Sequence, residues 1–165
     1  MGKNTNRWLY SNQSIYGRRR MPEVKWDRAL FNIQLNFDST GICNDHVLMR
    51  HVGLTRGQMN ERLTSGEIHN GFCTSYRDLQ ECKICVKSAL IESWDGIVAW
   101  LEREGGKPTY TIYSRMPKSD EESIFGIGLR EGSDDFEKCY GQCIILKKLL
   151  GAQYGFKIIT AYPVL

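Results

Sequence analysis

The sequence predicts an α+β domain in which helices come first and an antiparallel β-sheet follows. Between residues 45 and 104, apolar residues recur at three- and four-residue steps, as they do along one face of a helix. From residue 109 onward, the chain consists of short runs rich in β-branched and aromatic residues, separated by turn-prone segments. Because no helical pattern connects these runs, we expect the strands to pair antiparallel.

The first two helices are marked by their ends. Residues 45–52 mix apolar and polar side chains and are predicted to form a short helix that ends near Gly53. Thr55 is followed three residues later by Gln58, which is the pattern of a capping box. We therefore expect a second helix over residues 56–64.

The longest helical stretch is predicted to start at Ser75–Asp78, which also has the form of a capping box. Its apolar residues keep to one face through residues 100–101, and the glycines at 105–106 end it. A break is expected near residues 94–96. Strands are then predicted at residues 109–113, 124–129, 143–146 and 156–160.

Residues 1–40 differ from the rest of the chain. The first twenty are polar with scattered aromatic residues and are expected to form a loosely attached arm. Pro22 followed by Glu23 suits the start of a helix. We therefore divide the chain into an arm over 1–40, with a possible helix, and a domain over 41–165.

Composition permits a nucleic-acid substrate without arguing for one. Of 165 residues, 41% are hydrophobic and 25% charged, which is ordinary for a globular protein. The net charge of +3 is only mildly basic. No run approaches the ~20 apolar residues of a membrane span, and the N-terminus has no signal peptide. The chain is therefore either cytosolic or a piece of a longer exported protein.

Six cysteines occur, and two of them form a CxxC at Cys82 and Cys85. This pair lies inside a helical pattern, no second CxxC accompanies it, and no histidine has zinc-finger spacing to it. We therefore interpret both residues as part of the core and predict no metal site. Cys139 and Cys143 are four residues apart, and their spacing leaves pairing or metal ligation open.

Four residues near the middle and the end of the chain carry the chemistry. A histidine such as His51 can move a proton near neutral pH, and an arginine such as Arg62 can hold a phosphate bidentately. Thr160 and Tyr162 are two residues apart, so in a strand they project to the same face. Together these groups can cleave a phosphodiester without a metal, by moving protons and stabilising negative charge.

The pattern that contains these residues is specific. It comprises Arg50-His51-Val52-Gly53, an arginine eleven residues after the histidine, and the ending Ile159-Thr160-Ala161-Tyr162-Pro163. A segment at 72–75 and a Trp-Leu pair at 100–101 follow in the expected order. The chain resembles, over about residues 41–165, the bacterial RNase A-like toxin domain at the C-termini of contact-dependent inhibition proteins and other polymorphic toxins.

The resemblance implies an RNase A-like fold and a metal-independent endoribonuclease without cofactors. In that family the 2′-hydroxyl attacks the phosphate and leaves a 2′,3′-cyclic end. The family's active-site positions fall on His51, Arg62, Thr160 and Tyr162. The resemblance also implies an RNA substrate, a cognate immunity protein and a larger delivery protein to which the arm is a tether. The toxin would be a delivered effector that acts in the target-cell cytoplasm.

The residues leave the general acid open. His46 is a possible secondary site residue, but a regular helix turns it about 140° away from His51. His69 is predicted to lie in an exposed turn that could reach the substrate. Lys157 precedes Thr160 by three positions, so in a regular strand it faces the opposite side.

Two other functions fit parts of the sequence. A non-catalytic RNA-binding module would keep the fold and bind RNA without turnover. A cysteine-dependent or metal-dependent enzyme would use Cys82 and Cys85 and lose activity on alkylation or chelation. The four-residue set favours the ribonuclease, because a pure RNA binder does not need it.

Overall fold

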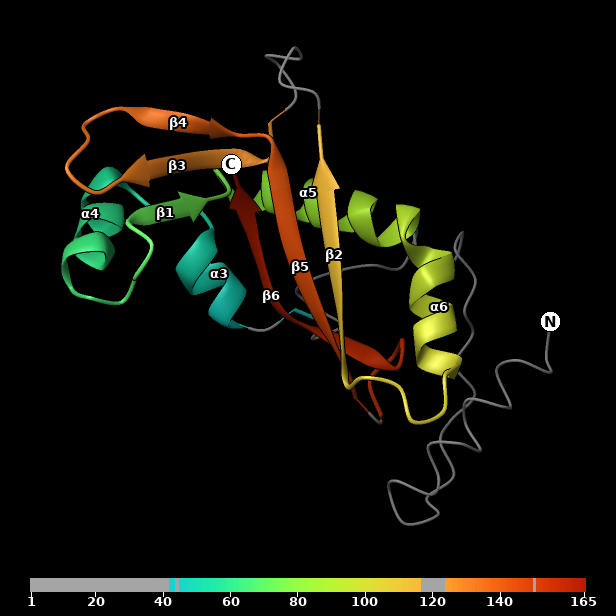
Figure 1. Cartoon of the computed structure of the whole chain (residues 1–165). Coiled ribbons are helices and arrows are strands. Elements are labelled where there is room, and N and C mark those ends of the chain that lie inside the picture. The colour runs from blue at the N-terminus through green and yellow to red at the C-terminus, as the bar shows by residue number, and fades with distance from the viewer. Residues whose placement is uncertain (1–41, 44, 117–123, 150) are drawn as a thin grey trace.

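The computed structural model describes residues 42–43, 45–116, 124–149 and 151–165 (Figure 1). The expected arm over 1–40, with its possible helix, lies outside the described residues, as do the side chains of Asp45, His46 and Leu48. In chain order the elements are α3 (Asp45–His51), α4 (Arg56–Thr64), β1 (Phe72–Ser75), α5 (Leu79–Glu92), α6 (Trp94–Glu102), β2 (Thr109–Arg115), β3 (Gly126–Arg130), β4 (Phe136–Cys139), β5 (Gly141–Lys148) and β6 (Phe156–Val164).

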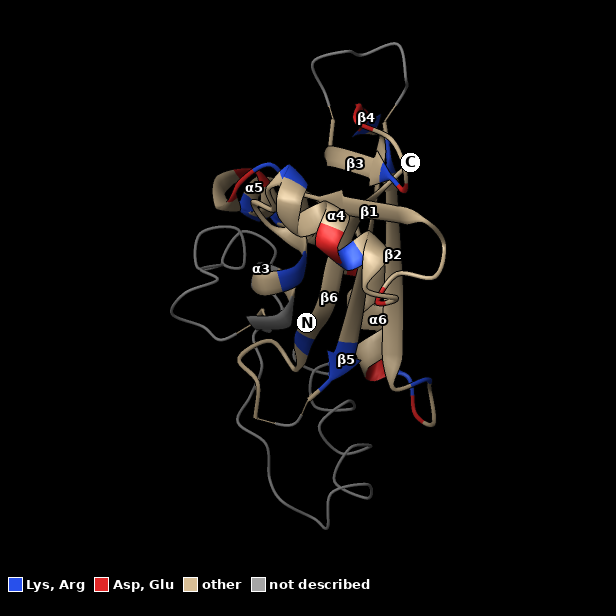
Figure 2. Cartoon of the chain, turned by 90° about the vertical axis from the view of Figure 1, so that its left-hand side faces the viewer, with Lys and Arg blue, Asp and Glu red and all other residues tan. Residues whose placement is uncertain are grey.

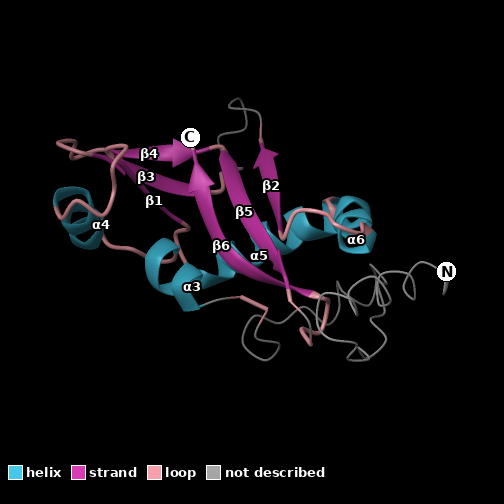
Figure 3. Ribbon diagram, turned by 60° about the horizontal axis from the view of Figure 1, so that its bottom comes forward, coloured by secondary structure: helices cyan, strands magenta, loops and turns pink. Residues whose placement is uncertain are grey.

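The α+β prediction is confirmed, with two antiparallel sheets in place of one. One sheet has the strand order β1-β3-β4 and the other the order β2-β5-β6. Strands β1 and β4 were not predicted, because each is only four residues long and lies in a segment without clear alternation. Figure 3 shows α3 beside β6 and α4 beside the sheet that contains β1.

Local capping explains the start of α4. The Thr55 Oγ1 accepts from the Gln58 amide at 3.3 Å, and the Gln58 Oε1 accepts from the Thr55 amide at 2.8 Å. This reciprocal pair satisfies two N–H groups that the first turn would otherwise leave unpaired. The predicted capping box at Thr55 and Gln58, and the predicted helix over 56–64, are therefore confirmed.

The predicted start of the long helix was wrong. Asp78, not Ser75, caps α5, because its Oδ1 accepts from the Glu81 amide at 2.7 Å. Ser75 instead ends β1, where its hydroxyl donates to the Tyr76 carbonyl at 2.7 Å. The break that separates α5 from α6 falls at Ser93, just before the predicted position.

The main core lies between the β2-β5-β6 sheet and the helices α5 and α6. Figure 1 shows α5 crossing behind this sheet. The largest fully buried side chains of this core are those of Tyr76, Leu90, Ile97, Leu101, Ile144, Leu146, Phe156 and Ile158. Each such side chain stabilises the fold by about 1.5–3 kcal/mol when it leaves water. None of the described helices is long and apolar enough to cross a membrane.

A β-bulge divides β6 into two parts. Ile145 of β5 pairs with Thr160, but the next residue, Leu146, pairs with Ile158, so Ile159 is an extra residue in β6. Such a residue reverses the alternation of side chains between the two faces. Before the bulge the even-numbered residues are buried, and after it the odd-numbered ones are buried. Lys157 therefore lies on the same face as Thr160, and the regular-strand prediction for it was wrong.

All six cysteines are present as free thiols. Cys82 lies in the core, fully buried, and Cys85 is half-buried beside it. Burial raises the pKa of the Cys82 thiol to about 12 and that of Cys85 to about 11. Reactive cysteines have lowered pKa values, so this pair is poorly suited to nucleophilic catalysis. Within the described ranges, no cluster of histidine, cysteine and carboxylate side chains could hold a metal ion.

Candidate active site

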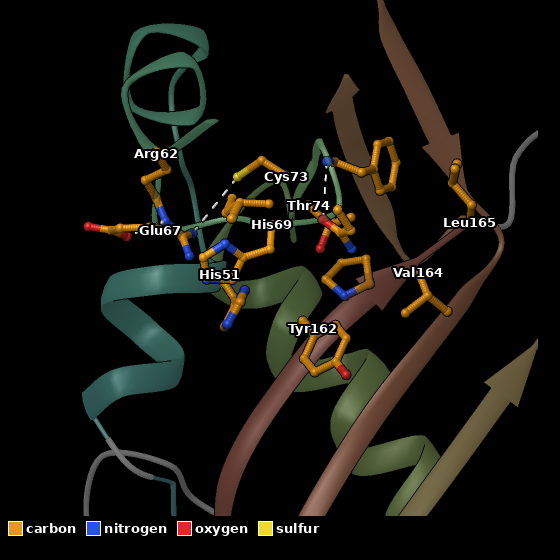
Figure 4. Close-up of a pocket in the computed structure, with 13 residues that line it drawn as sticks. His51, Arg62, Glu67, His69, Cys73, Thr74, Tyr162, Val164 and Leu165 are labelled. Atoms are coloured by element: carbon orange, nitrogen blue, oxygen red, sulfur yellow. Dashed lines mark hydrogen bonds and ion pairs between the residues drawn. The ribbon is translucent and has the colours of Figure 1, made fainter. Parts of the chain in front are cut away.

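A pocket of about 620 Å³ opens where α3, α4, β1 and β6 meet (Figure 4). Its size falls in the range that holds small organic ligands. Three of the four predicted site residues line it together, although they come from three different elements. The lining residues are His51, Arg62, Glu67, Ile68, His69, Asn70, Phe72, Cys73, Thr74, Tyr162, Pro163, Val164 and Leu165.

His51 is the last residue of α3, and the backbone after it is tied to the end of β1. The His51 carbonyl accepts from the Tyr76 amide at 2.8 Å, and the Gly53 amide donates to the Tyr76 carbonyl at 2.9 Å. Gly53 has φ of 65°, a conformation that side-chain-bearing residues rarely adopt. The glycine of the Arg-His-Val-Gly motif thus ends the helix and fixes the backbone from which His51 projects.

Arg62 lies in the last turn of α4 and is anchored on several sides. Its Nε donates to Glu67 at 3.3 Å, and its Nη1 donates to the Arg50 carbonyl and to the Cys73 Sγ, the latter at 3.9 Å. Glu67 also pairs with the Arg50 guanidinium. Among the described residues, the Arg62 contacts use Nε and Nη1 and leave the Nη2 donors for a ligand.

Glu67 is the main electrostatic feature that the sequence did not reveal. Hydrogen bonds from Arg50 and then Arg62 hold the pKa of this exposed carboxyl below its ordinary value of 4.5. Its negative charge balances part of the positive charge in the pocket. The only sequence signal was its position five residues after Arg62, at the end of a helix, and that spacing is too common to be informative.

Tyr162 projects from the second part of β6 into the pocket. Its ring lies 5.4 Å from the His51 ring, centroid to centroid, at an angle of 36°. A hydrogen bond with the Cys143 side chain, together with burial, raises the pKa of Tyr162 to about 12. The phenol therefore stays protonated near neutral pH and serves as a hydrogen-bond donor, not as a base.

Thr160 does not line the pocket. It is half-buried, and it projects to the same face of β6 as Tyr162 from a position two residues earlier in the strand. The structure therefore brings three of the predicted residues together and places the fourth at the edge of the site.

The two other histidines have different outcomes. His46 belongs to α3, but its side chain lies outside the described residues, so its predicted secondary role stays a prediction. His69 lies in the loop between α4 and β1 and lines the pocket. The pocket thus has two imidazoles, a guanidinium, a phenol and a carboxylate along its walls.

These groups match the requirements for cleavage of a phosphodiester. Imidazoles transfer protons, a guanidinium binds the anionic oxygens, and a phenol donates a hydrogen bond to one of them. The half-buried position of His51 and Arg62 excludes part of the water that would weaken these interactions.

Comparison with known proteins points to one family. A family model described as "Bacterial CdiA-CT RNAse A domain" matches residues 45–163. The fold is similar to a solved structure described as "Crystal structure of CdiA-CT/CdiI complex from Y. kristensenii 33638". Over 73% of this chain and 99% of that one, the TM-score is 0.61 and the sequence identity is 24%. The comparison with curated proteins gave no match.

Proposed function

This chain belongs to the bacterial CdiA-CT RNase A domain family, and on that basis we propose that it is an antibacterial toxin endoribonuclease. It cleaves RNA without a metal ion, through attack of the 2′-hydroxyl on the adjacent phosphorus. The P–O5′ bond breaks, and the products are a 2′,3′-cyclic phosphate and a free 5′-hydroxyl. The observation that carries the proposal is the meeting of His51, Arg62 and Tyr162 in one pocket.

His51 is assigned the proton transfer at the 2′-hydroxyl. Its position is supported by the hydrogen bonds of the flanking backbone and by the contact of its ring with Tyr162. A positioned acid or base of this kind accelerates a reaction by about 10²–10⁴-fold. His69 is the second imidazole of the pocket, and we assign to it the proton donated to the departing 5′ oxygen.

Arg62, Tyr162 and Thr160 stabilise the phosphorane that forms during attack. The Nη2 donors of Arg62 bind a phosphate beside Glu67, and the protonated phenol of Tyr162 turns from Cys143 to donate to a non-bridging oxygen. Thr160 lies in the row next to Tyr162 on the same face of the sheet, where its hydroxyl forms a hydrogen bond with the ribose or the neighbouring phosphate.

Incubation of the purified protein with total RNA in EDTA tests the proposal directly. We expect cleavage, 2′,3′-cyclic phosphate ends on the fragments, and no dependence on added divalent ions. His69→Ala should lower turnover of an ordinary RNA substrate far more than turnover of one with an activated aryl leaving group, which needs no acid. Binding of RNA without any cleavage would favour the alternative, a non-catalytic RNA-binding module.

The same proposal includes a dedicated protein partner. The related structure from Y. kristensenii 33638 is described as a complex of CdiA-CT with CdiI. We propose that this chain likewise has a cognate immunity protein, which presents acidic groups to the pocket and associates rapidly by electrostatic steering. The chain is delivered by a larger protein and acts in the cytoplasm of the target cell. Cytosolic expression of the wild-type chain alone should stop growth, and co-expression of the partner should restore it.

A further inference from the structure

The β2-β5-β6 sheet has one covered face and one open face. The covered face packs against α5 and α6. On the other face, the strand register sets the side chains in four rows across the sheet: Arg115–Gly141–Val164, Tyr113–Cys143–Tyr162, Thr111–Ile145–Thr160 and Thr109–Lys147–Lys157. In the part of the chain that the structure describes, no element covers these rows, and Figure 3 shows the sheet from this side. We call this surface the open face.

The open face is continuous with the candidate active site. Tyr162 belongs both to the second row and to the pocket wall, and Thr160 belongs to the third row. The bulge at Ile159 brings Lys157 to this face, in the fourth row. At about 3.3 Å per residue, the four rows extend over roughly 20 Å. A ligand that leaves the pocket along β6 therefore meets a surface several nucleotides long.

The charge of the sheet is one-sided. Its three strands hold Arg115, Lys147, Lys148 and Lys157 and no aspartate or glutamate. Figure 2 shows the same imbalance, with blue but no red on β5 and β6. Lys148 points to the covered face, where its ammonium lies 5.5 Å from the Trp100 ring centre. The other three cations are on the open face, which therefore attracts a polyanion.

Tyr113 adds an aromatic surface to this charge. Its side chain is 73% exposed, which is unusual for a large aromatic residue in a central row of a sheet. Cys143 lies between Tyr113 and Tyr162 in the second row, so the two phenols flank one thiol. Across two strand spacings, Tyr113 lies about 10 Å from Tyr162. An exposed aromatic ring beside cations is the usual platform on which bases of single-stranded RNA stack.

We propose that single-stranded RNA bound in the pocket continues over the open face. One base next to the scissile phosphate stacks on Tyr113, and more distant phosphates contact Lys147 and Lys157. This proposal rests on the proposed function, because it takes RNA to be the substrate, and it adds a binding site beyond the cleaved bond. It also explains two features together: the exposure of Tyr113, and the bulge at Ile159 that brings Lys157 to the open face.

The test measures binding without cleavage. The full chain carrying His51→Ala is titrated against a fluorescent single-stranded RNA of about eight nucleotides, a length typical of such binding sites, over a series of salt concentrations. Adding Tyr113→Ala should weaken binding about 10-fold with little change in salt dependence, because stacking is lost. Adding Lys147→Glu and Lys157→Glu should also weaken binding at least 10-fold and reduce the salt slope by about 1.4, or 0.7 per phosphate contact.

Matched controls separate this site from general effects. Phe136→Ala removes an exposed aromatic residue from β4, and Lys87→Glu reverses a charge on α5, behind the sheet. Both should bind RNA within about twofold of the parent, a difference of only a few tenths of a kcal/mol. Tyr113→Phe keeps the ring and should restore most of the affinity lost in Tyr113→Ala. Melting curves of every variant confirm that each is folded.

The outcomes distinguish the two proposals. If the open-face variants bind RNA as tightly as the parent, the open face is not an RNA site, whatever the wild-type enzyme cleaves. If the open-face variants lose binding to the immunity protein but still bind RNA, the open face is a protein interface and the RNA-site proposal is wrong. If binding falls as expected but wild-type protein leaves total RNA intact in EDTA, the RNA site stands and the ribonuclease proposal fails.

Discussion

The two walls of the pocket are built in contrasting ways. The wall formed by α4 and the loop after it is charged and partly exposed, and Glu67 of this loop pairs through its side chain with Arg62 of α4 and with Arg50 of α3. The wall formed by the end of α3 and β6 is held by backbone hydrogen bonds and by contacts of the His51 ring with Tyr162. The first wall binds charge with side chains that solvent can compete for, and the second fixes the groups that transfer or donate protons.

The contrast shows which substitutions should matter for turnover and which for binding. Exposed ion pairs contribute little to stability and respond to salt. Groups fixed in a drier, prearranged position contribute most when charge develops during the reaction. Variants on the second wall should therefore reduce kcat, and variants on the first should change KM as well.

His51→Ala should have the largest effect, because it removes the proton carrier from the rigid wall. We expect kcat to fall about 10⁴-fold, the upper end for loss of an acid or base. Cleavage of a short RNA is measured with RNA binding and melting temperature as controls. Cleavage close to the wild-type rate by a folded His51→Ala protein would remove the central claim.

Arg62→Lys tests the charged wall with its net charge unchanged. A lysine has no planar pair of donors, so it cannot hold Glu67 and a phosphate oxygen together. We expect kcat/KM to fall about 10³-fold, because stabilisation of the transition state is lost along with binding. If a steady-state assay gives full activity, Arg62 is only a surface residue and the two walls are not both needed.

Tyr162→Phe and Thr160→Val compare a residue inside the pocket with one at its edge. Each keeps its approximate volume and removes a hydroxyl. We expect Tyr162→Phe to lower kcat about 10²-fold, as for other donors to a developing negative charge. Thr160→Val should cost about 10-fold, the value of one ordinary hydrogen bond. Equal losses, or a change in melting temperature alone, would contradict this ranking.

Glu67→Gln should have the smallest effect, and it acts through charge. Loss of the carboxylate frees Arg62 for phosphate, so we expect KM for RNA to fall a few-fold at low salt, with little change in kcat. An increase in KM would mean that Glu67 mainly holds Arg62 in position.

The pH dependence of stability gives a second measure of the same pair. Arg50 and Arg62 lower the pKa of Glu67 in the folded protein below 4.5. The ion pair therefore stabilises the fold above pH 4.5, and this contribution is lost as the pH falls through the lowered folded-state value. The melting temperatures of wild type and Glu67→Gln should differ slightly at pH 7 and converge once the pH falls below the lowered pKa of Glu67. Divergence at low pH would contradict the assigned sign.

Features that depend on neighbouring residues were predictable from the sequence. The Thr55–Gln58 capping box is confirmed because its partners are three positions apart, and with it the place of Arg62 on α4. The resemblance of the motif around His51 also led to three residues that share the pocket.

Features that depend on distant pairing were not predictable. The prediction for the face of Lys157 is wrong, because the extra residue at Ile159 appears only when β5 and β6 are aligned. The sequence around Ser75 predicts a helix cap, but Ser75 ends β1, and this role depends on β3, which lies about fifty residues later. The same holds for Glu67, whose importance comes from the fold bringing two arginines to it.

The bulge at Ile159 has a consequence for how this domain can change over time. It offsets the two parts of β6 by one position, so that one part serves the core and the other the pocket. Many substitutions of Ile159 would keep this offset, because it depends on the number of residues and not on their identity. Deletion of the residue would instead turn either Tyr162 or Ile158 to the wrong side. At this position, the fold constrains the length of the chain more strictly than the identity of the amino acid.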